Sequence, residues 1–526
     1  MKTTFSKHPI ALAMFGLAVP WSTGIGAAVV EPELEAAMQT GTDVAFIAQF
    51  SERVDLSAFP GQGSGGGMQL AALLWALLTQ AETSQKNAVE LLKAGGATRI
   101  IELWSINALA ATASPDVVRD LAALPEVETI KLDATLAAPG PAPAASAPPE
   151  WNLEAVNAPA VWDQGLTGAG SVVAGMDTGV DAQHPDLADR WRGGSNSWFD
   201  PNGEHPTPYD RSGHGTGTMS VAVGGDAGGT SIGVAPGAEW IAVKIFNDAG
   251  VATLSGIHQG FQWLLDPDGN PATADIPDVV NNSWGFPNLA GQCYLEFQPD
   301  LEVLLAAGIA VVFSAGNQGS LGSVSPANNP DGFGVGAVDS TLTVTWTSSV
   351  GPSPCDGSIF PEVVAPGVGV RAADLGSGYL SVTGTSFAAP HVAGAIALLR
   401  QADPDASVAA LEQALTASAT DVGPAGADNT AGYGLLNVPL ALELLGTLPP
   451  PGPVCTDFDG DGFFAEPDCT MPVDCDDLDE SVNPAVCDIK GDGIDQDCDG
   501  VDRLRGKSCP TAGGDTGGGN GNNKNK

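Results

Sequence analysis

The chain has 526 residues, too many for one ordinary domain and enough to bury a large hydrophobic core. Its 62 Asp and Glu residues outnumber its 20 Lys and Arg residues, which gives a formal net charge of −42. A polyphosphate backbone would repel a chain this acidic, so the balance argues against nucleic acid as a partner. The charge instead favours a protein that stays dispersed in saline surroundings or one that binds cations.

Residues 1–28 have the pattern of a secretory signal peptide. Lys2 and Lys7 precede an apolar stretch that begins at Ile10, and small residues follow up to Ala28. The apolar stretch is too short to remain as a membrane-spanning helix, and no later segment offers about 18 uninterrupted apolar residues. We therefore expect a secreted, extracellular protein without a membrane anchor.

Residues 29–148 predict a small α+β domain followed by a linker. The domain begins with a strand, DVAFIAQF, and a long helix from Met68 to Lys93. One extended segment, RIIELWSINALAATA, comes next, and then a helix that begins at Pro115 and a last strand, VETIKL. The run APGPAPAASAPPE is too rich in Pro and Ala to fold and would be open to proteases.

Residues 149–447 predict an α/β fold. Short β-branched runs such as SVVAGMD, WIAVKIF and IAVVFSAGN alternate with helical segments rich in Gly and Ala. The runs are apolar on both faces, as expected of parallel strands that are covered by helices on each side. We therefore expect a doubly wound, mostly parallel sheet with helices on both faces.

Three segments of this region supply reactive side chains in the order Asp, His, Ser. Asp177 follows the strand SVVAGM, His214 lies between glycines at the start of a helix of small residues, and Ser386 opens a long helix. Because serine is a poor nucleophile at neutral pH, His214 would take its proton while Asp177 fixes the imidazole tautomer. Asn317 follows another apolar strand, and its side-chain amide can join the Ser386 backbone N–H in stabilising an oxyanion.

The segments GMDTGVDAQHPDL, DRSGHGTGTMSVAVGG and SVTGTSFAAPHVAG resemble those of subtilisin-family (subtilase) serine proteases, over roughly residues 150–445. The runs VVNNSWG and GVAPGAEWIAVKIF are most similar to the bacillopeptidase F-like branch. The resemblance implies a subtilisin-like fold, an acyl-enzyme mechanism without an organic cofactor, and protein or peptide substrates. It also implies that Ser283, Trp284 and Gly285 line the substrate backbone together with the strand before Asn317.

By the same resemblance, the domain before the linker is similar to the subtilase prodomain, a ferredoxin-like α+β unit that aids folding and inhibits its own enzyme. The protein would then be a zymogen that cuts its own chain somewhere in the linker before Trp151. A small domain joined to a protease by such a linker is in any case typical of a removable segment. An independent accessory domain is the alternative.

A Pro-rich linker over residues 448–454 precedes an Asp- and Cys-rich segment, 455–510, and a low-complexity tail, 511–526, which we expect to be disordered. The runs DFDGDG and DQDCDG place oxygen ligands at positions 1, 3 and 5 of EF-hand-like loops. The segment resembles the calcium repeats of secreted bacterial enzymes and thrombospondin type 3 repeats, in which calcium and disulfides replace a core. A disordered acidic spacer is the alternative. The predicted calcium ligands are Asp457, Asp459, Asp461, Asp468, Asp495, Asp497 and Asp499.

All eight Cys lie after residue 290, two in the α/β region and six between Cys455 and Cys509. Even numbers in each region favour disulfides that form outside the cytosol. Cys293 and Cys355 are the only two in the α/β region, so we expect them to pair, with free buried thiols as the alternative.

Two functions of different classes are compatible with these features. The first is an active endopeptidase that acts on extracellular protein, and the second is a calcium-dependent surface-binding protein on a protease scaffold. A protein that keeps only the scaffold would be expected to lose Asp177, His214, Asn317 or Ser386. Because all four are present, the sequence favours the endopeptidase and leaves binding as a role for the acidic segment.

Overall fold

The structure is a computed structural model that describes residues 28–59, 67–139 and 150–446. The predicted signal peptide up to residue 27 and most of the Pro/Ala linker lie outside these residues. The linker from residue 448, the predicted calcium ligands and the six Cys of the acidic segment lie outside them as well.

The N-terminal domain is a five-stranded sheet with strand order β1-β5-β2-β4-β3, in which only β1 runs parallel to its neighbour. Without β1 and the first helix, the elements follow one another as β-α-β-β-α-β, an order found in ferredoxin-like units. The elements are β1 (Val29–Val30), α1 (Pro32–Met38), β2 (Val44–Phe50), α2 (Gly67–Ala94), β3 (Thr98–Leu103), β4 (Ala108–Ala113), α3 (Pro115–Ala122), β5 (Val127–Leu132) and β6 (Thr135–Ala137).

The segment expected to be one extended run is instead a hairpin of β3 and β4, so that prediction is wrong in detail. A short 3-10 turn, Trp104–Ile106, and the left-handed Asn107 (φ 48°) separate the two strands. Asn tolerates this conformation better than most residues. Its side chain is also held in place, because Asn107 Nδ2 donates to the Glu52 carbonyl at 2.7 Å. A turn fixed by such distant contacts leaves little trace in the local pattern.

The larger domain is built on a seven-stranded sheet with strand order β14-β13-β12-β11-β7-β9-β8. Every neighbouring pair is parallel, and all residues of β12 and β13 are buried, which confirms the expected α/β fold. The strands are β7 (Val172–Asp177), β8 (Trp198–Phe199), β9 (Glu239–Lys244), β11 (Val279–Asn282), β12 (Ala310–Ser314), β13 (Phe333–Val338) and β14 (Val363–Pro366).

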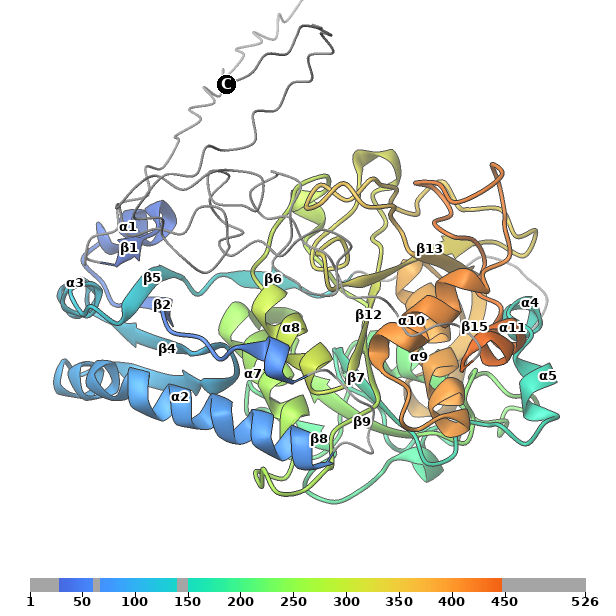
Figure 1. Cartoon of the computed structure of the whole chain (residues 1–526), viewed down its shortest axis with the longest axis horizontal. Coiled ribbons are helices and arrows are strands. Elements are labelled where there is room, and N and C mark those ends of the chain that lie inside the picture. The colour runs from blue at the N-terminus through green and yellow to red at the C-terminus, as the bar shows by residue number, and fades with distance from the viewer. Residues whose placement is uncertain (1–27, 60–66, 140–149, 447–526) are drawn as a thin grey trace, which may run out of the picture. The chain divides into compact units, whose positions relative to one another are not determined.

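Helices cover both faces of this sheet (Figure 1). Alternate residues of β12 belong to different hydrophobic clusters: Val312 packs in the cluster of α9, whereas Val311 and Phe313 pack in that of α7 and α8. The main helices are α6 (His214–Val223), α7 (Leu254–Leu265), α8 (Gln298–Ala306) and α9 (Thr385–Ala402). The remaining elements are α4 (Trp151–Ala155), α5 (Ala158–Trp162), α10 (Val408–Ala417), α11 (Val438–Leu444), β10 (Val251–Thr253) and the hairpin of β15 (Val368–Asp374) and β16 (Gly378–Thr383).

The N-terminal sheet packs against the α7 and α8 side of the larger domain, as Figure 1 shows. Ile47 of β2 and Ala108 of β4 share one buried cluster with Phe261 of α7 and Leu301 of α8. The last strand of the N-terminal domain, β6, also pairs antiparallel with β10, placing Leu136 opposite Ala252. The N-terminal domain therefore contacts the larger domain through both its sheet face and its last strand.

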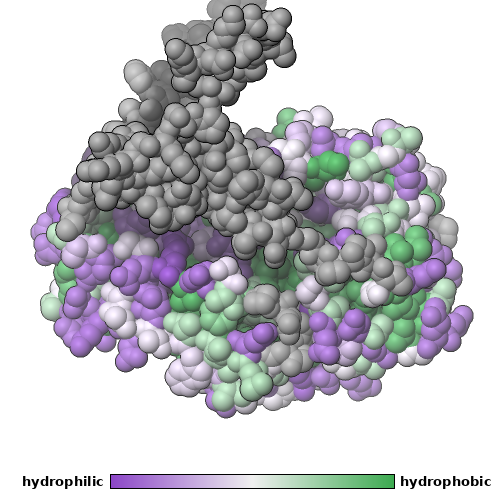
Figure 2. Space-filling model, viewed as in Figure 1, coloured by the Kyte–Doolittle hydropathy of each residue, from purple (hydrophilic) through white to green (hydrophobic). Residues whose placement is uncertain are grey.

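On the face shown in Figure 2, hydrophilic and hydrophobic residues are interspersed over the described surface. Among the described residues, no helix has the length and apolar character that crossing a membrane requires.

Candidate active site

Asp177 and His214 meet where β7 ends and α6 begins. His214 Nδ1 lies 2.8 Å from Asp177 Oδ1 and 2.9 Å from Oδ2. Gly215 permits this approach, because a Cβ at that position would lie 2.2 Å from the Gly179 carbonyl oxygen. Burial alone would lower the pKa of His214, but the charge and hydrogen bond of Asp177 outweigh it and raise the pKa above its usual value. The carboxylate thus favours a protonated imidazole.

Asp210 fixes the first turn of α6, and its role was missed by the sequence reasoning. Its Oδ1 accepts the backbone N–H groups of Ser212 and Gly213 at 2.9 and 3.0 Å. Its Oδ2 accepts both the N–H and the hydroxyl of Thr216 at 2.9 and 2.7 Å. Asp210 also helps to raise the pKa of His214. The signal was an Asp in the turn just before the helix, because a short acidic side chain there can accept the backbone N–H two residues further on.

Ser386 is the second residue of α9 and is nearly buried. Its hydroxyl donates to the Ser283 carbonyl oxygen at 3.3 Å, and the Ser283 hydroxyl donates to the Ser386 carbonyl at 2.7 Å. The backbone N–H groups of a first helical turn have no partner within the helix and attract negative charge. Ser386 and His214 line the same cleft.

Asn317 follows β12 and is oriented by the first residue of α9. Asn317 Oδ1 accepts the backbone N–H of Thr385 at 3.0 Å and its hydroxyl at 3.2 Å. Because the oxygen is engaged, the amide nitrogen is the group left to donate into the cleft. Gly384, directly before Thr385, has a φ of 143°, a backbone conformation that residues with a side chain rarely adopt. Thr385 is a second residue that the sequence reasoning missed.

The cleft is lined by the loops that follow β11 and β12. Ser283, Trp284 and Gly285 all border it, together with Ser314 and Asn317. Trp284 does so with its backbone, because its ring is buried in an edge-to-face stack with Phe297 and Phe313.

The strand that pairs with the N-terminal segment is β10, which the sequence reasoning did not single out. The Ala138 N–H donates to the Gly250 carbonyl oxygen at 2.7 Å, directly after the β6 pairing. Ala137, Ala138 and Pro139 then line the cleft beside His214 and Ser386. The described part of the N-terminal domain therefore runs from β6 into the cleft and ends there at Pro139.

Cys293 and Cys355 form a disulfide with a Cα–Cα distance of 4.8 Å. It links the loop after β11 to the loop between β13 and β14. The described residues contain no free cysteine.

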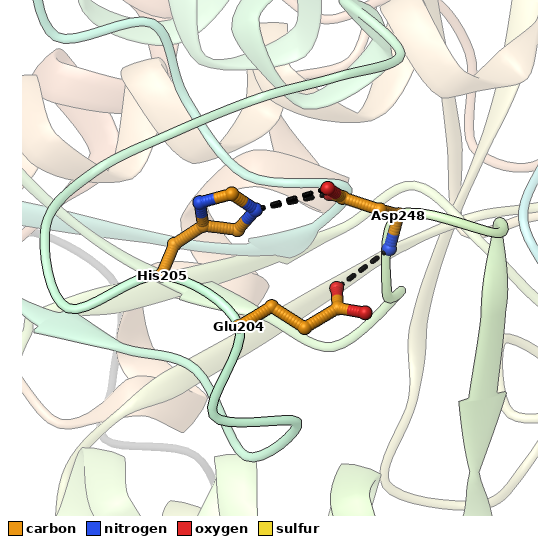
Figure 3. Close-up of side chains that lie close together, drawn as sticks. All are labelled: Glu204, His205 and Asp248. Carbon is orange, nitrogen blue, oxygen red and sulfur yellow. Dashed lines mark hydrogen bonds and ion pairs between the residues drawn. The ribbon is translucent and has the colours of Figure 1, made fainter.

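Two groups of described side chains are close enough to share a metal ion, and neither includes a ligand predicted from the sequence. The first, Glu204, His205 and Asp248, is satisfied internally: His205 points at the Asp248 carboxylate and Glu204 accepts the Asp248 N–H at 2.7 Å (Figure 3). Lys244 Nζ also lies 3.4 Å from Asp248 Oδ1, which supplies a positive charge already. The second group comprises Asp266, Asp268 and Asp275.

Comparison with known proteins gives a consistent result. A model of the subtilase family matches residues 168–434. The chain is 35% identical over 407 residues to Bacillopeptidase F of Bacillus subtilis (strain 168), which covers 70% of this chain and 28% of that protein. It is 35% identical over 341 residues to an alkaline protease of Alkalihalobacillus alcalophilus, covering 65% and 80% of the two chains. It is 36% identical over 292 residues to Subtilisin Savinase of Lederbergia lenta, covering 55% and 97%.

Proposed function

From the premise that this chain belongs to the subtilase family of serine endopeptidases, we propose that Asp177, His214 and Ser386 hydrolyse the peptide bonds of its substrates. One observation supports this most strongly. His214 is bound to Asp177 at 2.8 Å in a cleft that Ser386 and Asn317 also line. The arrangement brings together a nucleophile, a base, an orienting carboxylate and an oxyanion donor.

The chemistry follows from these positions. His214 Nε2 takes the proton of the Ser386 hydroxyl as its oxygen attacks the substrate carbonyl carbon. Asp177 holds the other imidazole nitrogen protonated and stabilises the cation that forms. The Asn317 amide and the Ser386 N–H stabilise the oxyanion. His214 then gives the proton to the leaving amine as the peptide C–N bond breaks. In the second half, His214 takes a proton from water as the water oxygen attacks the acyl carbon. It returns that proton to the Ser386 oxygen when the acyl bond breaks.

The protein is made as a self-processed zymogen in this proposal. Support comes from β6 and Ala138, which place the end of the N-terminal domain in the cleft in the manner of a substrate strand. This domain would act as an intramolecular inhibitor until the chain is cut and the domain dissociates. The domain limits 29–148 and 149–447 are part of the same proposal.

Secretion and calcium binding are proposed from residues outside the described part of the chain. Lys2, Lys7 and the apolar stretch after them support export. The similarity to relatives named as an alkaline protease and a subtilisin supports it as well. Subtilases often bind calcium and need no organic cofactor. The Asp spacing between residues 457 and 499 supports a calcium module there. Surface binding, the alternative function, would belong to this module and not to the protease domain.

The test is the variant Ser386→Ala in the full chain. It should stay folded, keep residues 29–139 attached and cleave no casein, because the nucleophile is absent. Ser358→Ala is the matched control, since Ser358 is exposed outside the cleft and its loss should leave processing and activity intact. Normal processing or casein cleavage by Ser386→Ala would overturn the mechanism.

A further inference from the structure

Val324 lines the cleft and is only 3% exposed. One of its methyl groups lies against the backbone on both sides of the cleft. A Cβ placed on Gly285 would be 3.0 Å from Val324 Cγ2, and a Cβ placed on Gly316 would be 2.8 Å from the same atom. This methyl therefore fills the gap between the loop after β11 and the loop after β12.

That gap is next to the reacting groups. Ser283, directly before the Trp284–Gly285 pair, accepts the hydroxyl of Ser386. Gly316 directly precedes Asn317, the proposed oxyanion donor. A substrate carbonyl held between Ser386 and Asn317 must therefore place the side chain of its own residue near the two glycines and Val324.

Val324 is held in place. Its carbonyl oxygen accepts the Asn328 N–H at 3.3 Å, and the next carbonyl, of Ser325, accepts the Phe286 N–H at 3.0 Å. On the other side, the Ser323 carbonyl accepts the Gly291 N–H at 2.8 Å. A β-branched side chain also has few rotamers available. The pocket cannot deepen by a simple rotation of this residue.

Few groups that line the cleft could form an ion pair with a charged substrate side chain. Of the described residues that line it, His214 is the only one with a titratable side chain, and the proposed mechanism uses it. The N-terminal domain contributes Ala137, Ala138 and Pro139 to the cleft, and these residues are compact and uncharged. An uncharged pocket with a valine between its two walls agrees with the compact residues that occupy the cleft.

We propose that Val324 determines substrate specificity by restricting the residue whose carbonyl is attacked to small, uncharged side chains such as Ala. Aromatic and long aliphatic side chains would collide with the Val324 methyl groups, and acidic or basic ones would find no partner. This inference rests on the proposed function of the cleft and adds the class of substrate that it accepts.

The experiment measures kcat/KM for peptide anilides Leu-Ala-Ala-Xaa, in which Xaa is Ala, Leu, Phe, Lys or Glu. The wild-type protein should prefer Ala over Phe by about tenfold or more, the size of discrimination that a few misplaced carbon atoms give in an apolar pocket. Val324→Ala should raise kcat/KM for the Phe peptide by about tenfold or more. Val324→Leu should lower kcat/KM even for the Ala peptide.

Val344→Ala is the matched control, because Val344 is a partly buried valine that does not line the cleft. It should leave the ratio of Ala to Phe cleavage unchanged. Self-processing and the melting temperature show whether each variant folds.

The experiment separates a failure of the proposed function from a failure of the proposed role of Val324. No hydrolysis of any peptide by the folded, processed wild-type protein would overturn the proposed function. Hydrolysis that prefers Phe, or a ratio that Val324→Ala and Val324→Leu leave unchanged, would overturn the role of Val324 while leaving the mechanism intact.

Discussion

The ammonium group of Lys131 in β5 lies 2.8 Å from Glu296 Oε1, joining the N-terminal sheet to the catalytic domain. The same carboxylate oxygen lies 3.0 Å from His258 Nε2, and His258 Nδ1 lies 2.7 Å from Asp300 Oδ2. His258, Glu296 and Asp300 are buried. Release of the N-terminal domain, as proposed above, would remove Lys131 from Glu296 and leave the contact with His258 in place.

We therefore expect Lys131→Met to speed release of the N-terminal domain after the chain is cut. Removing one partner of a buried, hydrogen-bonded ion pair acts mainly on dissociation, so the rate should rise about tenfold or more. The measurement is the lag between chain cleavage on a gel and full activity on a peptide. Arg119→Met is the control, because its ion pair with Asp116 is exposed to solvent and should not change the lag. An unchanged lag in Lys131→Met would contradict the prediction.

The same cluster predicts how stability depends on pH. Burial opposes the charge on His258, but Asp300 and Glu296 outweigh it and raise its pKa from 6.5 to about 9. The resulting stabilisation is complete below pH 6.5 and is lost as the pH rises through 9. The pKa of Glu296 shifts in the opposite direction: despite its burial, His258 and Lys131 lower it to about 2. Its contribution to stability is therefore present above pH 4.5 and is lost as the pH falls toward 2.

Unfolding of the uncleaved Ser386→Ala protein should therefore become easier between pH 6.5 and 9, by on the order of 2–3 kcal/mol from His258. Chemical denaturation across this range measures the change. Replacing the imidazole in Ser386→Ala/His258→Gln should flatten the pH dependence, whatever it does to the absolute stability. A slope that survives this replacement would assign the effect to other groups.

Asn317→Ala should lower kcat by about 10² to 10³, with little effect on KM, a magnitude known for such a donor in subtilisin, a relative of this chain. In the proposed mechanism, the Asn317 amide nitrogen donates to charge that develops only in the transition state. Thr385→Val should cause a smaller loss, because the Thr385 N–H still holds Asn317 Oδ1 after the hydroxyl is removed. Steady-state kinetics on one peptide would show both effects. A purely higher KM in Asn317→Ala would place the side chain in ground-state binding.

Asp210→Asn should shift the acid limb of the pH–activity profile to lower pH. Asp210 helps to raise the pKa of His214, and the imidazole must be neutral to act as a base. Without the Asp210 charge, His214 loses its proton at a lower pH. Asp200→Asn is a suitable control, because Asp200 accepts backbone N–H groups of a similar turn elsewhere. Identical acid limbs for wild type and Asp210→Asn would show that this charge does not reach His214.

The parts of this molecule that were predictable depend on local pattern. Strands that are apolar on both faces predicted the parallel sheet, and His214 was correctly placed between glycines at a helix start, where Gly215 permits a close approach to Gly179. Asp177, His214, Asn317 and Ser386 could be chosen because each follows a strand or opens a helix in a distinctive segment, and the structure brings all four to one region.

The parts that escaped prediction depend on contacts between distant residues. Lys131 and Glu296 are far apart in the chain, and nothing around either one indicates an ion pair across two domains. Val324 lies in an unremarkable loop, and its position between Gly285 and Gly316 exists only after the two strands before them are side by side. The pairing of β6 with β10 is similarly a product of docking, since both strands are only three residues long.

Because β6 pairs with β10 within one chain, the proposed inhibition would depend on dilution once the chain is cut. As long as the strand and the cleft belong to one chain, the cleft sees a fixed and high local concentration of its own peptide, however little protein is present. After the cut, the two pieces are separate molecules, and the fraction that stays together falls as the volume around them grows. After the cut, such an enzyme would stay inhibited at high protein concentration and become active on dilution.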